Sequence, residues 1–464
     1  MQKSTDPTRH LIDFICRLKF EEIPEGVIDK GKQCLLDALG VIIGALRWPE
    51  GRKISKFNSD DSGSEMSTLL GTGLKAPTLQ AVFKHGSLSE LLELQDGIPN
   101  PGLHAGTSVI PSAIAMGELK GISGKELLVS IISGYEVLDR IGSLIYKKSW
   151  GKIMTTGLVG SLGAATAAGK ILGLSKNKLL SALGIASYLT PLSIGENFFT
   201  GVSCKPFQGG QCAEAGVKAI QLVMEGFSGS PNILLGSPPR YAGLCAIFSD
   251  KDKIGKKGFM ENLGEKFAMS EVYFKPYPCG RLGHGAIDCI LSLRQKYKLD
   301  TKEIKQIRII TNSKTAWSLG QTYTNVNSTR YECQLSIPYI VAATLIDGKF
   351  TLEQLEPNRY KDGEIISCES KITVEGSRKL DKLGAKTRAT ILELYTTNDR
   401  KLKCRVDYPK GDHRNSMSWE ELEEKYTRLT GEILEPDKVN KSIDVIKNIE
   451  SLDNIQELLH LLKG

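Results

Sequence analysis

The hydrophobic period of this sequence changes along the chain, and this change limits the possible folds more than any other feature. Up to about residue 268, apolar residues recur at steps of three and four, as in Leu11, Phe14, Ile15 and Leu18 and again within Leu127–Ile145. This is the period of an amphipathic helix. The first part of the chain is therefore predicted to be helical almost throughout.

After Lys275 the period shortens to two. From Leu402 to Tyr408 every second residue is apolar, and Lys403, Arg405 and Asp407 lie between them. Such alternation is typical of a β-strand with one solvated face. Two stretches with a helical period lie among the predicted strands, near Ile287–Gln295 and Ile337–Asp347. Together these patterns indicate a smaller α+β unit.

From Ser418 the helical period returns, and Ser418 with Glu421 forms the sequence pattern of a capping box. The simplest assembly is a mainly α fold. In this assembly both chain ends, residues 1–268 and 401–464, build a large all-helical domain. Residues 269–400 form a smaller α+β lid domain that is inserted into it.

Composition excludes several kinds of partner. The chain has 464 residues, 41% of them hydrophobic, so it can bury a large core. Its net charge is only +7 and no basic run contains interleaved aromatics, so we expect no nucleic-acid partner, whereas an anionic small molecule would suit the charge. The longest apolar stretch, Cys34–Leu46, is too short to cross a bilayer.

The remaining composition predicts a cytoplasmic location. The amino terminus is polar and shows no signal peptide. The ten cysteines are scattered and form no CxxC pair, which favours free thiols in a reducing compartment over a zinc or redox site.

Common cofactor and nucleophile motifs are missing from the sequence. The six histidines show no metal-type spacing, and neither a GxGxxG after a strand nor a GxSxG turn occurs. The GAATAAGK end of Gly157–Gly173 has one residue too many for a phosphate loop, and Ile171 stands where a Ser or Thr is required. We therefore expect no metal and no organic cofactor, and a core helix at this segment.

Three segments have a composition suited to chemistry. In the first, Glu90, Glu93 and Asp96 recur at steps of three before a Gly/Pro loop that ends in His104, so the acids are predicted to share a helix face. They form either a solvated stripe or, because leucines surround them, a partly enclosed group whose pKa would shift toward neutrality.

The other two segments carry cations. Lys205 precedes a proline and a glycine-rich helix start, where backbone N–H groups already favour anions; an ordinary surface lysine is the alternative. Lys275, Arg281 and His284 occupy a loop at the predicted domain junction, where ligand clefts commonly form. These groups would suit a polycarboxylate if the fold brings them together.

Eight segments occur in an order that resembles the MmgE/PrpD family, and the resemblance covers nearly the entire chain. They are LLDALG (Leu35–Gly40), LELQDG (Leu92–Gly97), GYEVLDRIG (Gly134–Gly142), KPFQGGQCAEAG (Lys205–Gly216), EGFSGSPNILLG (Glu225–Gly236), KPYPCGRLGH (Lys275–His284), SIPYIVAATLIDG (Ser336–Gly348) and YPKGDHRNSMSWEELEEKY (Tyr408–Tyr426).

The resemblance implies a helical body with an α+β lid, usually a homodimer, and a site between the two parts that needs no metal or organic cofactor. It implies that His104 and an acid of the LELQDG motif, Glu93 or Asp96, handle protons. Cations aimed at the charge that develops beside a carboxylate lower the barrier. The implied catalytic lysines are Lys205 and Lys275, and the implied substrate-binding residues are Gln208, Arg281 and His284.

The sequence also departs from the family pattern. Glu90, Met154 and Gln208 stand where the family commonly has histidine, and the acidic motif reads ELQDG instead of DFDDT. Three hypotheses follow. The first is a lyase of dehydratase type that acts on a small polycarboxylic acid. The second is an epimerase of a dicarboxylate such as iminodisuccinate, and the third is a non-catalytic protein that binds an acidic metabolite or a partner.

Overall fold

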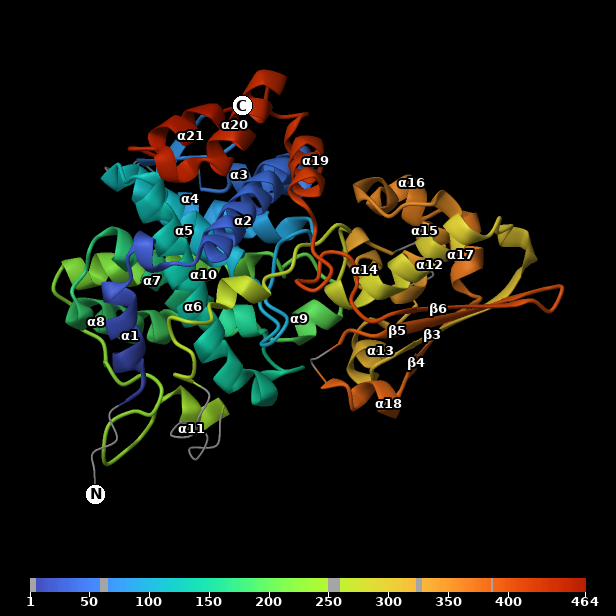
Figure 1. Ribbon diagram of the computed structural model, residues 1–464, viewed down its shortest axis with the longest axis horizontal. Coiled ribbons are helices and arrows are strands. Elements are labelled where there is room, and N and C mark those ends of the chain that lie inside the picture. Colours follow the sequence, from blue (N-terminus) through green and yellow to red (C-terminus); the bar gives the residue numbers. More distant parts are fainter. Residues whose placement is uncertain (1–5, 59–65, 249–258, 323–327, 385–386) are drawn as a thin grey trace.

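The computed structural model describes residues 6–58, 66–248, 259–322, 328–384 and 387–464. Its helices form a large body to which a smaller lid is attached (Figure 1). The body helices are α1 (Thr8–Arg17), α2 (Glu25–Gly44), α3 (Pro49–Lys56), α4 (Thr78–Leu91), α5 (Gly106–Lys120), α6 (Gly124–Ser149), α7 (Thr155–Ile171), α8 (Lys176–Leu189), α9 (Glu196–Phe199), α10 (Phe207–Met224), α11 (Leu244–Phe248), α19 (Trp419–Thr430), α20 (Pro436–Lys447) and α21 (Gln456–Leu461).

The centre of the body is built by α4, α5, α6, α7 and α10, which pack against one another. Nearly every residue of α7 is buried, which confirms the predicted core helix at this segment. Small residues line this helix, so the backbones of its neighbours can approach it closely. The body also contains a short antiparallel pair, β1 (Met66–Thr68) and β2 (Lys75–Pro77), that the sequence patterns did not indicate.

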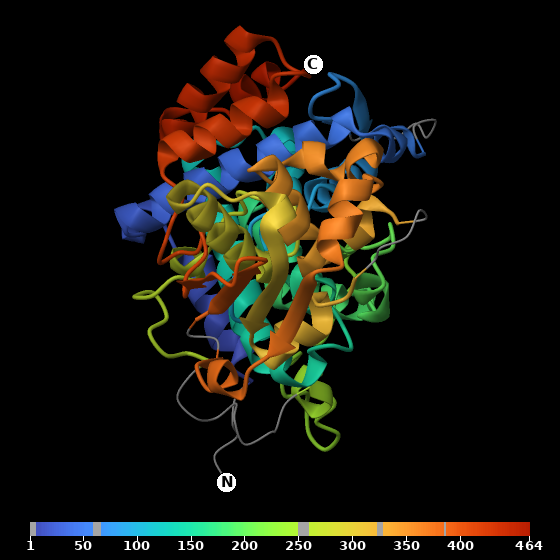
Figure 2. The same ribbon diagram turned by 90° about the vertical axis from the view of Figure 1, so that its right-hand side faces the viewer.

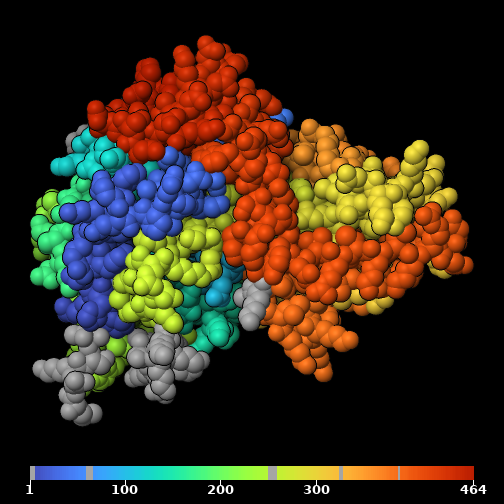
Figure 3. All heavy atoms as spheres, in the orientation of Figure 1, coloured from blue at the N-terminus to red at the C-terminus, as the bar shows by residue number. Residues whose placement is uncertain are grey.

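Both ends of the chain contribute to the body, as predicted. Helix α19 packs along α2, and the buried Lys425 donates hydrogen bonds to Asp37 (2.6 Å) and to the carbonyl of Leu94 (2.8 Å). Figure 3 shows the carboxy-terminal helices lying directly against amino-terminal ones. The predicted capping box is also present, because Ser418 and Glu421 cap α19 reciprocally.

The lid is an α+β unit around one four-stranded sheet of order β4-β3-β5-β6. Strands β3 and β4 are parallel, and the other two pairs are antiparallel. In Figure 2 the lid faces the viewer, and the carboxy-terminal helices of the body lie above it. The lid elements are α12 (His284–Lys296), β3 (Ile304–Thr311), α13 (Ser313–Leu319), α14 (Arg330–Cys333), α15 (Ile337–Asp347), α16 (Pro357–Tyr360), α17 (Gly363–Glu369), β4 (Ile372–Gly376), α18 (Arg378–Asp381), β5 (Thr390–Thr396) and β6 (Lys401–Val406).

One edge of the lid lies beyond the predicted boundary at residue 400. Strand β6 pairs with β5, and Leu402 is buried while Lys401 and Lys403 are exposed. The alternation that predicted a strand here is therefore correct, and the sheet extends past the end assigned to the lid.

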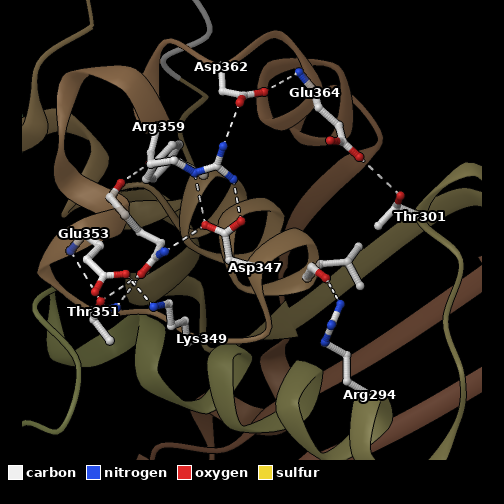
Figure 4. Close-up of polar contacts among 12 residues, drawn as sticks. Arg294, Thr301, Asp347, Lys349, Thr351, Glu353, Arg359, Asp362 and Glu364 are labelled. Carbon is white, nitrogen blue, oxygen red and sulfur yellow. Dashed lines mark hydrogen bonds and ion pairs between the residues drawn. The ribbon is translucent and has the colours of Figure 1, made fainter.

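Polar contacts hold the helices of the lid together away from the body (Figure 4). Arg359 of α16 pairs with Asp347 at the end of α15 and, at 2.7 Å, with Asp362, which caps α17. Gln354 donates a hydrogen bond of 2.8 Å to the same Asp347. Helix α16, the start of α17 and the turn that carries Gln354 are thereby fixed to α15, which packs against α12. Within the described ranges of the chain, none of the helices meets the length and hydrophobicity that a transmembrane span requires.

Candidate functional site

The site begins at the close crossing of α4 and α10. A Cβ atom added to Gly86 would lie 2.8 Å from the carbonyl carbon of Gly209, and one added to Gly209 would lie 2.7 Å from the carbonyl oxygen of Gly86. Only two glycines allow the backbones to meet this closely. The contact brings Lys205, which precedes α10, to the end of α4.

Helix α4 ends earlier than predicted, and this corrects the expected acidic face. Its last residue is Leu91, and Glu93 has a left-handed backbone with φ of 54°. A residue at this point after a helix is usually glycine, and the conformation carries a modest strain in any other residue. Glu90, Glu93 and Asp96 therefore do not share one helix face, because the chain turns between them.

Glu93 lies between the buried Lys275 and the partly buried Lys205. Lys205 forms an ion pair with its Oε1 atom, and Lys275 donates a hydrogen bond of 2.7 Å to its Oε2 atom. Burial opposes ionisation of Glu93, but the two ammonium groups outweigh it and hold the pKa of the carboxyl well below its usual value. Glu93 is thus a carboxylate at neutral pH.

Glu90 completes this charged cluster on the α10 side. Its Oε2 atom accepts a hydrogen bond of 2.8 Å from Gln208 and lies 3.3 Å from the Lys205 ammonium. Burial raises the pKa of Glu90, whereas the two glutamates together overcome burial and raise the pKa of Lys205. Lys275 has only Glu93 as an acidic partner in this cluster, and burial lowers its pKa.

His104 is held as a neutral imidazole. Its Nδ1 atom lies 2.7 Å from the backbone carbonyl oxygen of Asp96. Because a carbonyl only accepts, Nδ1 carries the proton and Nε2 is left as the basic nitrogen. Burial, together with the charges of Lys275 and Lys205, lowers the pKa of His104 well below its usual value. Nε2 is therefore unprotonated at neutral pH, which is the form that a proton acceptor requires.

The Asp96 side chain makes its hydrogen bonds to residues other than His104. Its carboxyl accepts hydrogen bonds from the Tyr135 hydroxyl (2.6 Å) and the Gly106 amide (3.1 Å). Burial raises its pKa to about 7. This side chain does not line the cavity beside Glu93, so Asp96 acts on His104 through its backbone.

A cavity of about 140 Å³ lies where the body meets the lid. Glu93 and His104 line it from the body, while Arg281 and Arg388 line it from the start of the lid and from the segment before β5, and Lys275 lies on the segment that joins the two parts. Its wall is completed by aromatic and aliphatic side chains that include Tyr146, Trp150, Ile153, Met154, Phe198, Tyr273 and Leu319.

Arg281 is buried at this cavity, but it keeps hydrogen-bond donors that no side chain of the described residues uses. It pairs with Asp412 at 3.1 Å and lies over the Tyr273 ring. Its Nε and Nη1 atoms have no hydrogen-bond partner among the described residues. Unpaired guanidinium donors in a buried site favour a bound carboxylate.

The structure brings together most of the residues that the sequence singled out. Lys205 and Lys275 both contact Glu93, and His104 lines the same cavity as Glu93, Lys275 and Arg281. Gln208 lies behind Glu90. His284 is buried beside the carbonyl of Cys279 at 3.3 Å and does not line the cavity. The roles assigned to these side chains remain predictions.

Tyr273 and Arg388 are among the polar residues of the cavity that were not found from the sequence. Tyr273 lies two residues before Lys275, so an aromatic next to a basic motif was the available signal. Arg388 donates a hydrogen bond of 2.8 Å to the carbonyl of Pro99 and belongs to no motif. Within the described part of the chain, no group of three or more His, Cys, Asp or Glu residues has the arrangement of a metal site.

Known proteins resemble this chain over most of its length. Cis-aconitate decarboxylase of Homo sapiens is 26% identical over 465 residues, which cover 96% of this chain and 92% of the relative. Cis-aconitate decarboxylase of Mus musculus is 25% identical over 473 residues, which cover 98% and 93%. 2-Methylcitrate dehydratase of Escherichia coli (strain K12) is 22% identical over 389 residues, which cover 78% and 77%.

Family profiles agree with the two-part architecture. The profile of the MmgE/PrpD N-terminal domain matches residues 9–256. The profile of the MmgE/PrpD C-terminal domain matches residues 277–451, which include the lid and the helix α19 that returns to the body. Because these matches cover more than half of the sequence, the chain belongs to the MmgE/PrpD family.

Proposed function

We propose that this protein is a lyase that dehydrates a small polycarboxylic acid by removing a proton next to a carboxylate. One observation carries the proposal. A neutral imidazole, His104, lies in the same buried cavity as the Lys275 ammonium and the partly unpaired Arg281 guanidinium. The names of the relatives support the same class of substrate, since they act on cis-aconitate or 2-methylcitrate.

The proposed reaction uses side chains of this chain alone. Arg281 binds one carboxylate of the substrate, and His104 Nε2 takes the proton from the adjacent carbon. The electron pair of the C–H bond forms the new double bond while the C–O bond to the hydroxyl breaks. Lys275 gives the departing hydroxide a proton and releases water. Its pKa is lowered by burial, which makes it a better acid than an exposed lysine.

Glu93 has a supporting role in this scheme. Between two lysines it stays ionised, so it positions Lys275 and balances its charge while the substrate is absent. The carboxylates of the substrate then add negative charge to a cavity that also contains Arg281 and Arg388. Fixed cations of this kind stabilise the charge that develops next to a carboxylate.

Decarboxylation is the second candidate, because relatives named cis-aconitate decarboxylase cover 98% or 96% of this chain. Proton NMR in heavy water separates the two reactions and also tests the epimerase alternative. Dehydration of citrate or 2-methylcitrate gives an alkene without carbon dioxide. Decarboxylation of cis-aconitate releases carbon dioxide, whereas epimerisation introduces deuterium without loss of any group. If none of the di- and tricarboxylates tested in this way changes, the enzyme proposal is overturned.

The proposal includes a homodimer. Tyr188, Leu192 and Ile194, at and after the end of α8, are 91%, 63% and 53% exposed. Clustered apolar side chains of this kind commonly mark a protein interface. Sedimentation velocity of Leu192→Asp tests the proposal, with Leu74→Asp as the control because Leu74 is 64% exposed elsewhere. A monomer in the unmodified protein would contradict the homodimer.

A cytoplasmic location is the last part of the proposal. All ten cysteines are free, and most are buried, which suits a reducing compartment. Fractionation of cells that produce the protein tests the location, and recovery in a secreted fraction would contradict it.

A further inference from the structure

The hydroxyl of Tyr273 has no role in the proposed reaction, although this side chain lines the cavity and is only 5% exposed. Among the described residues, no group forms a hydrogen bond with the hydroxyl. A buried hydroxyl that gives up its hydrogen bonds to water costs free energy unless it gains another partner. An unpaired hydroxyl at the wall of a cavity therefore points to a bound ligand.

The position of this hydroxyl is fixed by Gly97. The backbones of Tyr273 and Gly97 exchange hydrogen bonds of 2.9 and 3.1 Å, so Tyr273 is held against the loop that ends in His104. A Cβ atom added to Gly97 would lie 2.5 Å from the Tyr273 hydroxyl oxygen. The hydroxyl thus occupies a space that only glycine leaves free at this position.

The same loop holds the proposed base. The carbonyl oxygen of Asp96, the residue before Gly97, lies 2.7 Å from Nδ1 of His104. The face of the Tyr273 ring carries the Arg281 guanidinium, which lies 4.7 Å from the ring centroid. Tyr273 therefore contacts both the loop that orients the base and the guanidinium that binds a carboxylate in the proposed reaction.

The Tyr273 hydroxyl is a hydrogen-bond donor at neutral pH, because burial raises its pKa to about 12. A carboxylate accepts such a hydrogen bond more strongly than a neutral group does. Arg281 favours a carboxylate at this end of the cavity, since its Nε and Nη1 atoms have no partner among the described residues. The two side chains thus offer donors to the same kind of group.

We propose that Tyr273 is a further substrate-binding residue, whose hydroxyl donates a hydrogen bond to a carboxylate of the substrate beside Arg281. The inference rests on the proposed function, because it assigns a residue to the same site. A hydrogen bond to a charged group changes affinity roughly 10- to 100-fold. Negative charge builds up next to this carboxylate when the proton leaves, so the same bond stabilises the transition state.

Tyr273→Phe removes only the hydroxyl and tests the inference without any catalytic step. Isothermal titration calorimetry of the full chain measures the binding of tricarballylate, an unreactive tricarboxylate. We expect its dissociation constant to rise roughly 10- to 100-fold. Tm should stay the same or rise, because the variant loses a hydroxyl that had no partner. A dissociation constant that changes by less than a factor of two would overturn the inference.

Tyr426→Phe is the matched control. The Tyr426 hydroxyl is also buried, but it forms a hydrogen bond of 2.8 Å with Ser442, and neither residue lines the cavity. This variant should lower Tm and leave tricarballylate binding unchanged. Equal losses of binding in the two variants, or equal losses of Tm, would assign the Tyr273 hydroxyl a structural role and overturn the inference.

The heavy-water experiment makes the two failures distinguishable. If citrate or 2-methylcitrate reacts but Tyr273→Phe binds tricarballylate as tightly as the unmodified protein does, the contact is wrong and the reaction stands. If binding weakens as expected but no acid reacts or exchanges a proton, the reaction is wrong and the contact stands. Absence of tricarballylate binding by the unmodified protein overturns the inference, whatever the outcome in heavy water.

Discussion

At the scale of single residues, the site depends on Glu93, whose carboxylate is shared by Lys205 and Lys275. Glu93→Gln would leave the Lys275 ammonium buried without a counter-ion, whereas Lys205 would keep Glu90. We expect a loss of about 3 kcal/mol in the free energy of unfolding, since removing one partner of a buried ion pair typically costs this much. Urea unfolding measures the change.

Glu375→Gln is the matched control for this variant, because Glu375 pairs with Arg308 in a largely exposed contact on the lid sheet. Exposed pairs contribute about 0–1 kcal/mol. Equal losses in the two variants would contradict the importance of the buried cluster.

His104→Ala tests the proton acceptor. We expect kcat/KM to fall by roughly 10²–10⁴, the usual contribution of a general base, with little change in Tm. His460→Ala alters an exposed histidine and is expected to leave the rate unchanged. Because the pKa of His104 lies well below its usual value, the unmodified enzyme should keep its rate as the pH falls below 6.5. A loss smaller than tenfold in His104→Ala would argue for another base.

Asp96 predicts a pH dependence of stability. Its pKa is about 7 in the folded protein because of burial, against 3.8 as the ordinary value. The folded state therefore holds the proton more tightly than the unfolded state between these values, so stability falls as the pH rises from about 4 to 7. Asp96→Asn should flatten this part of the profile of Tm against pH. The same substitution at the exposed Asp453 should leave the slope unchanged.

The sequence could supply these residues only as candidates. Lys205 and Lys275 lie 112 and 182 residues from Glu93, so no local spacing could show that they converge. Local composition marked both lysines as candidates and the family resemblance implied their role, whereas Arg388 belongs to no motif and was missed. The left-handed conformation of Glu93 also had no signal, because glycine usually marks such a position.

At the scale of secondary-structure elements, the α4–α10 crossing sets the distance between the two halves of the charged cluster. Gly209→Ala would place a Cβ atom 2.7 Å from the carbonyl oxygen of Gly86. We expect the helices to separate at a cost of about 1–3 kcal/mol. Activity should fall as well, because Lys205 would move away from Glu93. Unfolding midpoints and kcat/KM measure both effects.

Gly26→Ala is the control at this scale. A Cβ atom there would meet no atom within 4 Å, and the residue lies in α2. Alanine favours a helix over glycine by about 1 kcal/mol, so this variant should be as stable as the parent or more so. Full activity in Gly209→Ala would show that the crossing does not position the lysine.

Elements were predictable where their signals are local. The start of α19 was predicted correctly, because the side chains of Ser418 and Glu421 each accept a hydrogen bond from the other residue's backbone N–H within one turn. The alternation at Leu402 identified β6 for a similar reason. The end of α4 and the β1–β2 pair were missed, because contacts with distant parts of the chain determine both.

At the scale of the whole molecule, body and lid each supply part of the cavity, so a ligand that contacts both should stabilise their arrangement. We expect tricarballylate, an unreactive tricarboxylate, to raise Tm. At one hundred times its Kd the gain corresponds to about 2.7 kcal/mol. Arg281→Met should lose most of this shift, whereas Arg240→Met, at an exposed residue, should keep it. A shift that survives in Arg281→Met would remove the guanidinium from the binding site.

The contact between Lys425 and Asp37 spans 388 residues, and this separation has a consequence for synthesis on the ribosome. When α2 and its neighbours emerge, the helix that will cover them does not yet exist, and the complete lid is translated before it. The lid, whose contacts lie within one continuous segment, can fold while the chain grows. The face of α2 that packs against α19 stays uncovered until the final stretch leaves the exit tunnel, so nascent chains stalled before residue 419 would expose it to chaperones.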